Sequence, residues 1–406
     1  MRIAPRSVFI AAVYGALAGA LAAVTFWGMN AVSDAVWSIS DARWYVAAAI
    51  MAGGVLIALI RRQTEDVDLG TQLTLTSDPL HLKKRSTLFL ALSAIVAVGF
   101  GGAVGPEAGL IAVVSEASAI VALLIARSEA EARLIGDTGS VAALSGLYGS
   151  PPGAAVYADE NEDLRQMHSG DGENATPLPL KFLGAVAGLG GFLFVANRLM
   201  PSNTLRLPLP AYDAPFDGSD LLWALVPALL GAIIGSVFRF LQPRISVALS
   251  KMGRPGLQTL IGTAVFAALA AAFPLVRFSG HHELIHALEH GIQNTAWTAL
   301  LGLGFLKALA LAICLSSGWR GGAAFPLMFA GAVASLAAIA FLPGTPTTVA
   351  LVAGMTAATT VGMGKPIAVL LIMLMFTGMS APGAMFIGVL IGYGASRFFP
   401  EVVSKH

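Results

Sequence analysis

Residues 101–106 read Gly-Gly-Ala-Val-Gly-Pro, and residues 321–326 read Gly-Gly-Ala-Ala-Phe-Pro. The first stretch interrupts an apolar run over 86–126, and the second stands at the start of an apolar run over 323–342. Glycine and proline disfavour a continuous helix, so we expect one helix to end and another to begin at each stretch. These two breaks set the framework of the fold.

The composition around them is that of an integral membrane protein. Of 406 residues, 56% are hydrophobic and only 12% are charged, against about 25% charged in ordinary globular proteins. This excludes a soluble multidomain protein and predicts an all-α polytopic chain. The net charge of +1 gives no reason to expect nucleic acid as a partner, and a single cysteine, Cys314, excludes an internal disulfide.

The apolar runs predict the crossings. The first, over 7–29, follows Arg2 and Arg6 and is too long for a signal peptide, so we expect it to cross the membrane. Further runs lie near 44–60, 86–126, 180–200, 221–241, 257–275, 296–316, 323–342, 347–375 and 382–396. A break at membrane depth is tolerated only where protein covers it or where it lines a watery cavity.

Basic residues gather in two loops, one from Arg61 to Arg85 and one from Arg239 to Arg254, which the positive-inside rule places in the cytoplasm. The polar, proline-rich stretch 201–220 predicts a join between two halves, 1–200 and 201–406. We expect a single integral membrane domain over 1–406 with no cytoplasmic regulatory domain.

The two halves echo one another. The two Gly-Gly-Ala stretches are one pair of echoes. Pro152 and Pro366 open similar apolar segments, and Gly15 and Gly231 lie in similar Gly- and Ala-rich runs. Three echoes in the same order and at nearly equal intervals indicate a duplication. Paired helix breaks in two halves are typical of transporters built from inverted repeats, which bind substrate at the breaks.

A helix that begins inside the membrane presents unpaired N–H groups and the positive end of its dipole. Such an end attracts an anion, and glycines let the ion approach the backbone. Pro106 and Pro326 suit the first helical turn, where no N–H is needed. The competing interpretation, glycines that merely allow close helix packing, stays open.

At these residues the chain resembles the CLC family of chloride channels and chloride/proton antiporters. Residues 316–326, Ser-Ser-Gly-Trp-Arg-Gly-Gly-Ala-Ala-Phe-Pro, look like the family's Ser-Gly-x-x-Gly-Gly-x-Phe-x-Pro segment, and residues 102–106 look like its Gly-Arg/Lys-Glu-Gly-Pro segment. Residues 151–154 and 364–368 resemble its two Ala-Pro-Leu-x-Gly stretches. The resemblance implies a homodimer, one anion pathway per subunit, and two antiparallel halves of short, tilted helices.

Carried over residue by residue, the resemblance implies a set of anion-binding positions. They are Gly102, Ala103, Val104, Gly105, Pro106, Gly322, Ala323, Ala324, Phe325, Pro326 and Thr71.

Departures from the family pattern bear on the mechanism. The position of the family's gating glutamate is Val104, which can neither take a proton nor replace an anion. The serine that contacts chloride is missing or replaced by Thr71, the late tyrosine has no clear counterpart, and Phe325 stands one place late. These departures favour passive conduction of chloride or a similar small anion.

The alternative is a proton-coupled chloride antiporter. Glu107, three positions after Val104, would then replace the missing carboxylate, although a first-turn glutamate also simply stabilises a helix N-terminus. The inner proton-relaying glutamate would fall near Glu160, Asn161 or Glu162, and the alignment leaves that choice open.

A remote alternative comes from His282-Glu283-Leu284-Ile285-His286, which spells the zinc-peptidase pattern His-Glu-x-x-His, with His290 one turn further on. The segment lies in a polar connection, and no later motif supplies the usual carboxylate ligand, so we expect solvated histidines on a short helix. We therefore expect no enzyme, no metal and no cofactor. The absence of targeting signals favours a multi-pass protein of the bacterial inner membrane.

Overall fold

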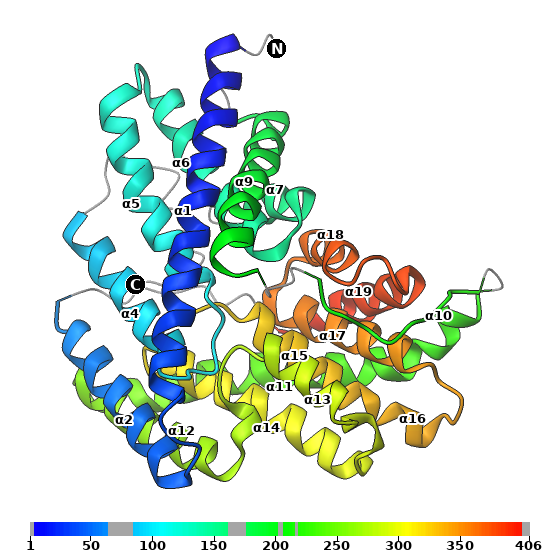
Figure 1. Ribbon diagram of the computed structural model, residues 1–406. Coiled ribbons are helices and arrows are strands. Elements are labelled where there is room, and N and C mark those ends of the chain that lie inside the picture. The colour runs from blue at the N-terminus through cyan, green and yellow to red at the C-terminus, as the bar shows by residue number, and fades with distance from the viewer. Residues whose placement is uncertain (1–3, 64–83, 161–175, 202–205, 216–217, 400–406) are drawn as a thin grey trace.

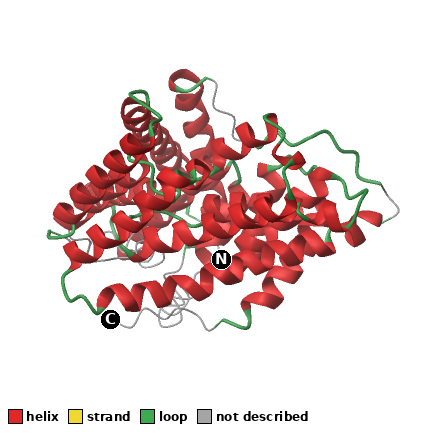
Figure 2. Ribbon diagram, turned by 90° about the horizontal axis from the view of Figure 1, so that it is seen from below, coloured by secondary structure: helices red, strands yellow, loops and turns green. Residues whose placement is uncertain are grey.

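The computed structural model describes residues 4–63, 84–160, 176–201, 206–215 and 218–399. Within these ranges the regular structure is helical, with a single isolated β-bridge and no strand (Figure 2). The all-α prediction is confirmed.

The helices of the first half of the chain are α1 (Pro5–Trp37), α2 (Arg43–Ile60), α4 (Lys84–Gly99), α5 (Glu107–Ile125), α6 (Glu129–Tyr148), α7 (Pro151–Asp159) and α9 (Leu178–Leu199). The later helices are α10 (Ser219–Trp223), α11 (Leu225–Ser250), α12 (Pro255–Ala272), α13 (His281–Glu289), α14 (Trp297–Ser316), α15 (Ala324–Leu336), α16 (Ala338–Phe341), α17 (Thr347–Met363), α18 (Pro366–Phe376) and α19 (Pro382–Ser396), with 3-10 turns at Pro274–Val276 and Ile292–Asn294.

Eight helical stretches among the described residues are long and apolar enough to cross a membrane. The stretch Ala324–Phe341 is the most enclosed, with 83% of its span buried within the protein. This burial is what a short helix at membrane depth needs, because its ends carry unsatisfied backbone groups that lipid cannot pair.

The expected helix breaks are confirmed. The run over 86–126 divides into α4 and α5, and the stretch 321–326 lies between the end of α14 at Ser316 and the start of α15 at Ala324. The run over 347–375 also divides, into α17 and α18. Gly364, at φ 67°, ends α17 in a left-handed conformation, and Pro366 then opens α18. Gly149, at φ 63°, and Pro151 do the same between α6 and α7.

The order of elements repeats. In the first half α4, α5, α6, α7 and α9 follow one another, as α14, α15, α17, α18 and α19 do in the second. The packing repeats too: α5 lies against α4 and α6, and α15 lies against α14 and α17. Figure 1 shows the first group around α1 and the second around α11, while α2 crosses over to pack beside α12.

Close helix packing explains the glycines of the first span, such as Gly19, and those of the similar run around Gly231. A methyl group at Gly19 would lie 1.9 Å from the carbonyl oxygen of Gly188 on α9, and one at Gly231 would lie 2.2 Å from that of Gly354 on α17. These glycines let backbones touch. Their partners are α9 and α17, which are not equivalent in the repeat, so this echo is looser than the others.

The structure also corrects the register of the duplication. Gly99 and Ser316 are the last residues of α4 and α14, and Pro106 and Ala323 are the residues before α5 and α15. Measured by these helix ends, the second Gly-Gly-Ala stretch stands three places too late to match the first. Helix ends, rather than matching letters, therefore define the equivalence.

Candidate functional site

The two breaks meet. Gly105 and Gly322, equivalent in the repeat, exchange both backbone hydrogen bonds across an antiparallel bridge, at 2.8 Å and 3.0 Å. Antiparallel pairing of equivalent residues is the arrangement that a local two-fold axis between inverted halves produces. This bridge places the N-termini of α5 and α15 side by side.

Each break is built by the same turn. Gly101 and Gly318 take left-handed φ values of 79° and 89°, which disfavour residues with a Cβ. The next residues, Gly102 and Trp319, donate their N–H groups to Ala97 and Cys314, five residues back. This pattern satisfies carbonyls at the end of the preceding helix and reverses the chain toward the bridge.

The first turn of α15 offers N–H groups to an anion. Ala324 begins the helix without a side-chain cap or an acidic residue in its first turn, and Pro326 has no N–H. All thirteen residues of α15 are buried, so water does not compensate this helix end. Its positive dipole end calls for a negative group.

Glu107, the first residue of α5, supplies that group. Its side chain is fully buried, and its Oε1 accepts a hydrogen bond of 3.1 Å from the hydroxyl of Tyr148. The backbone of Gly322, whose N–H already donates to the Gly105 carbonyl, and the backbone of Phe325 lie close to the same carboxyl group. Oε2 nevertheless accepts no hydrogen bond of ordinary geometry from the described residues.

The carboxyl group fills the space that the bridge glycines leave open. A methyl group at Gly105 would lie 2.0 Å from Oε2 of Glu107, and one at Gly322 would lie 2.2 Å from the same oxygen. The glycines were expected to let an ion approach the backbone. In this structure the carboxyl group of Glu107 takes that place.

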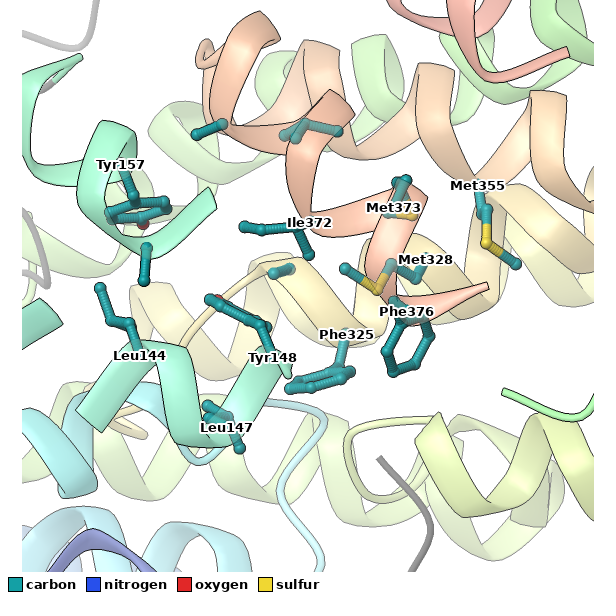
Figure 3. Close-up of a cluster of buried hydrophobic side chains, with 14 of the residues drawn as sticks. Leu144, Leu147, Tyr148, Tyr157, Phe325, Met328, Met355, Ile372, Met373 and Phe376 are labelled. Carbon is teal, nitrogen blue, oxygen red and sulfur yellow. The ribbon is translucent and has the colours of Figure 1, made fainter. Parts of the chain in front are cut away.

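An aromatic cluster continues from this point. The rings of Tyr148 and Phe325 lie 5.5 Å apart, and that of Phe376 lies 5.9 Å from Phe325 (Figure 3). The ring of His281 lies 5.5 Å from Phe325 and 5.4 Å from Phe376. A cavity bordered by these last three residues has a volume of about 10 Å³, close to that of one water molecule, so this side of the site is closed to a chloride-sized ion.

Val104, which stands at the family's gate position, is buried. It belongs to an apolar cluster with Trp319 and Phe266, whereas Tyr148 and Phe325 belong to another. Its side chain packs on its own repeat equivalent, Gly321, where a methyl group would lie 2.4 Å from Cβ of Val104. Val104 therefore fills space beside the bridge.

The remaining expected positions are distributed around the bridge. Gly102 and Ala103 form the buried approach to it, Pro106 and Ala323 are the residues before α5 and α15, and Pro326 lies in the first turn of α15. Thr71 and Glu162 lie outside the described residues.

Glu160 is placed at another helix end. Its two carboxylate oxygens accept hydrogen bonds from the N–H groups of Ile367 and Ala368, at 3.1 Å and 2.8 Å. Nearby, the ammonium of Lys365 donates to the carbonyl of Tyr157 and lies over its ring. Glu160 thus stabilises the N-terminus of α18, a role that leaves its part in proton transfer a prediction.

The His-Glu-x-x-His residues form the short helix α13, as expected. His282 and His286 are exposed, His286 pairs with Glu289 at 3.5 Å, and the ring of His290 contacts the carbonyl of His286. Across the part of the chain that the structure describes, no three His, Cys, Asp or Glu side chains gather as a metal site.

Sequence reasoning missed Tyr148 and Lys307. The family resemblance directs attention to a tyrosine near the C-terminus and not to Tyr148. The available signal was its place just before Gly149-Ser150-Pro151, a sequence typical of a helix end. Lys307 is fully buried in α14 and donates to the carbonyls of Val276, Arg277 and Phe278. A single lysine within an apolar run was the available signal.

Comparison with known proteins agrees with this architecture. The family model described as voltage gated chloride channel matches residues 53–397, most of the chain. The chain belongs to this family. The resemblance drawn from the glycine stretches is therefore confirmed, and the paired breaks are the family's framework in this chain.

The curated relatives match this chain at low sequence identity and over part of its length. The putative ion-transport protein YfeO of Escherichia coli O6:H1 is 26% identical over 261 residues, which is 63% of this chain and 59% of that protein. The chain thus matches less than two thirds of the length of these curated relatives. YfeO of Shigella flexneri is 25% identical over the same extent.

Two solved structures share the fold at a TM-score of 0.77. One is a CLC-type fluoride/proton antiporter, 17% identical, with 97% of this chain and 96% of that chain covered. The other is a slow cyanobacterial Cl-/H+ antiporter, 15% identical, with 98% and 95% covered. The predicted fold, two inverted repeats with broken helices in a multi-pass membrane protein, is confirmed.

Proposed function

We propose that this protein carries chloride or a similar small anion across a membrane in a proton-linked manner, with Glu107 as the gate. The observation that carries the proposal is the buried carboxyl group of Glu107 in front of the uncapped N-terminus of α15. A carboxylate and a chloride ion are alternative occupants of such a helix end, because both are small anions.

The chemistry follows from that competition. While Glu107 is ionised, its charge is favoured by the α15 dipole and by the hydroxyl of Tyr148, and no anion can take its place. A proton on the carboxyl removes this attraction, so the side chain can leave and an anion can replace it. Loss of the proton would return the carboxylate and expel the anion, which links the two movements.

The sequence by itself favoured passive conduction, because Val104 stands where the family's carboxylate is expected. The position of Glu107 favours the antiporter over passive conduction, because its carboxyl group, three residues after Val104, reaches the N-terminus of α15. The names of the structural neighbours, a fluoride/proton and a Cl-/H+ antiporter, are in keeping with the antiport interpretation.

Assembly and location belong to the same proposal. We propose a homodimer with one pathway per subunit, two halves that divide near residue 200, and residence in the bacterial inner membrane. The repeat of α4–α9 by α14–α19 supports the division. No enzymatic activity and no cofactor is proposed.

The test uses purified protein in liposomes, with chloride efflux and proton movement recorded together. We expect linked fluxes in the parent protein, and chloride efflux without proton movement in Glu107→Gln. Glu129→Gln is the matched control, because Glu129 also lies in a first helical turn but is exposed.

Three other outcomes of the liposome experiment would contradict the proposal in part or in whole. Chloride efflux without proton movement in the parent protein would establish passive conduction. Coupling that survives in Glu107→Gln would remove Glu107 from the gate. No anion flux in the parent protein would overturn the proposed function.

A further inference from the structure

A groove separate from the bridge opens between the end of α2 and the start of α12. Its volume is about 730 Å³. It is bordered by Val55, Ala58, Leu59, Arg61, Arg62, Gly253, Arg254, Pro255, Gly256, Leu257 and Leu260. Both helices are candidate membrane spans and lie beside one another, so the groove stands where the spans meet a basic loop (Figure 1).

Among the residues that the structure describes, three arginines and no carboxylate border this groove. Arg61 is buried and already engaged: its guanidinium donates to Thr259 at 2.7 Å and to the carbonyl of Ser317 at 3.1 Å. Arg62 and Arg254 are exposed, and within the described ranges their side chains make no hydrogen bond or ion pair. The groove therefore has two uncompensated cations at its mouth.

The backbone adds to this positive potential. Arg254 precedes α12 without a side-chain cap, Pro255 is the first helical residue, and the first turn of α12 holds no acidic residue. The positive end of the α12 dipole is thus aimed at the same place as the two guanidinium groups.

The other wall is apolar. Val55, Leu59 and Leu257 are 45%, 50% and 43% exposed, high values for large apolar side chains. They lie on two candidate membrane spans, so an acyl chain is a suitable covering for them. A phosphate alone would leave this wall uncovered.

We propose that this groove binds an anionic phospholipid of the cytoplasmic leaflet. Its phosphate meets Arg62, Arg254 and the N-terminus of α12, and an acyl chain follows Val55, Leu59 and Leu257. The two basic loops that the positive-inside rule assigns to the cytoplasm include these arginines, which fixes the leaflet. The charge complementarity of two unpaired arginines with one phosphate selects the anionic class.

Arg61 connects this groove to the turn between α14 and α15. Arg61 borders the groove and packs on Gly318, where a methyl group would lie 2.6 Å from its guanidinium nitrogen. Its bond to Ser317 holds the turn that leads to the bridge. A lipid in the groove therefore stabilises the contact between α2, α12 and this turn.

The experiment titrates delipidated, detergent-purified protein with dioleoyl phosphatidylglycerol or dioleoyl phosphatidylcholine. Retained lipid is counted by native mass spectrometry, and Tm is measured in parallel. We expect the parent protein to retain phosphatidylglycerol in preference to phosphatidylcholine and to gain Tm with it. The variant Arg62→Gln/Arg254→Gln should bind phosphatidylglycerol about 10- to 30-fold more weakly.

Controls separate this site from general charge effects. Arg198→Gln/Arg244→Gln removes the same charge from exposed arginines elsewhere and should retain the parent preference. Arg62→Lys/Arg254→Lys keeps the charge, and its retention of binding would show that positive charge at these two positions is what the lipid needs. The Tm of the Gln variant without lipid shows whether that variant is folded.

Equal phosphatidylglycerol binding in the parent protein and the Gln variant would overturn the proposal. An equal Tm gain from sn-glycerol 3-phosphate, which has the phosphate without acyl chains, would overturn its lipid part. Equal loss of binding in the Arg198/Arg244 variant would reduce the effect to net charge and would also overturn it.

Discussion

The break before α5 and the break before α15 have the same backbone and different side chains. Both use a left-handed glycine, both return a hydrogen bond five residues back, and both end at a bridge glycine. At the first helical residue, however, one carries Glu107 and the other Ala324. The preceding helices differ as well, since Lys307 of α14 corresponds to Leu90 of α4.

This difference separates two contributions. The repeated backbone provides two converging helix N-termini, which attract anions whatever the side chains are. The side chains break the symmetry, because a buried carboxyl group from one half faces the helix end of the other. The first half thus supplies the buried carboxyl group of Glu107, and the second supplies the helix N-terminus that it faces.

The largest effect on transport is expected at the repeat-equivalent pair Val104 and Gly321, where there is room for only one side chain. In Gly321→Ala the new methyl group would lie 2.4 Å from Val104 and 2.7 Å from the Gly105 carbonyl oxygen. We expect a loss of about 1–3 kcal/mol in stability and a more than tenfold loss of anion flux, measured by unfolding and liposome efflux. Gly28→Ala, whose methyl group meets nothing within 4 Å, should keep the parent flux. Normal flux in Gly321→Ala would show that the bridge tolerates separation.

Lys307 is a buried lysine whose equivalent in the first half is Leu90, so its replacement tests a charged group that the two halves do not share. In Lys307→Met three backbone carbonyls, those of Val276, Arg277 and Phe278, lose their donor. We expect a loss of about 2–3 kcal/mol in the free energy of unfolding, because these groups stay partly buried. Leu90→Met, at the equivalent position of α4, is the matched control and should change stability by less than about 1.5 kcal/mol. Equal losses in the two variants would remove any special role for the ammonium.

Tyr148 tests how firmly the gate is held. Tyr148→Phe removes the hydroxyl that donates to Glu107, so an anion should displace the carboxyl group more easily. We expect anion flux at fixed pH to rise about fivefold, which corresponds to about 1 kcal/mol. Tyr14→Phe, which removes a buried hydroxyl bonded to Ser118 at 2.7 Å, should leave the flux unchanged. A fall in flux in Tyr148→Phe would mean that the hydroxyl serves the anion instead.

The smallest effect concerns a charged contact of the first half away from the bridge. Burial alone would raise the pKa of Glu131, but the N–H of Arg127 and the guanidinium of Arg6, at 2.8 Å, lower it below its ordinary value. Its contribution is therefore complete above about pH 4.5 and is lost as pH falls through the lowered pKa. We expect less than about 1 kcal/mol, measured as the difference in acid unfolding between the parent and Arg6→Gln. The second half holds the start of α17 with a neutral bond from Thr348 to the Pro210 carbonyl, so Thr348→Val should show no such pH dependence.

Much of the framework could be predicted from the sequence because it depends on local chemistry. Apolar runs predicted the spans, and glycine with proline predicted the breaks between α4 and α5 and between α14 and α15. The family resemblance followed from the same residues. The register did not, because the second Gly-Gly-Ala stretch stands three places later than the helix ends require.

The sequence by itself determined that this is a helical, duplicated membrane protein with few charges and helix breaks suited to an anion. Only the tertiary structure decided which side chains occupy those breaks. Val104, at the position of the family's gating glutamate, lies against Gly321, whereas Glu107 reaches the N-terminus of α15 and meets Tyr148 from α6. The physical reason is that a helix end and its counter-charge come from opposite halves of the chain, and their meeting depends on packing that no local pattern encodes.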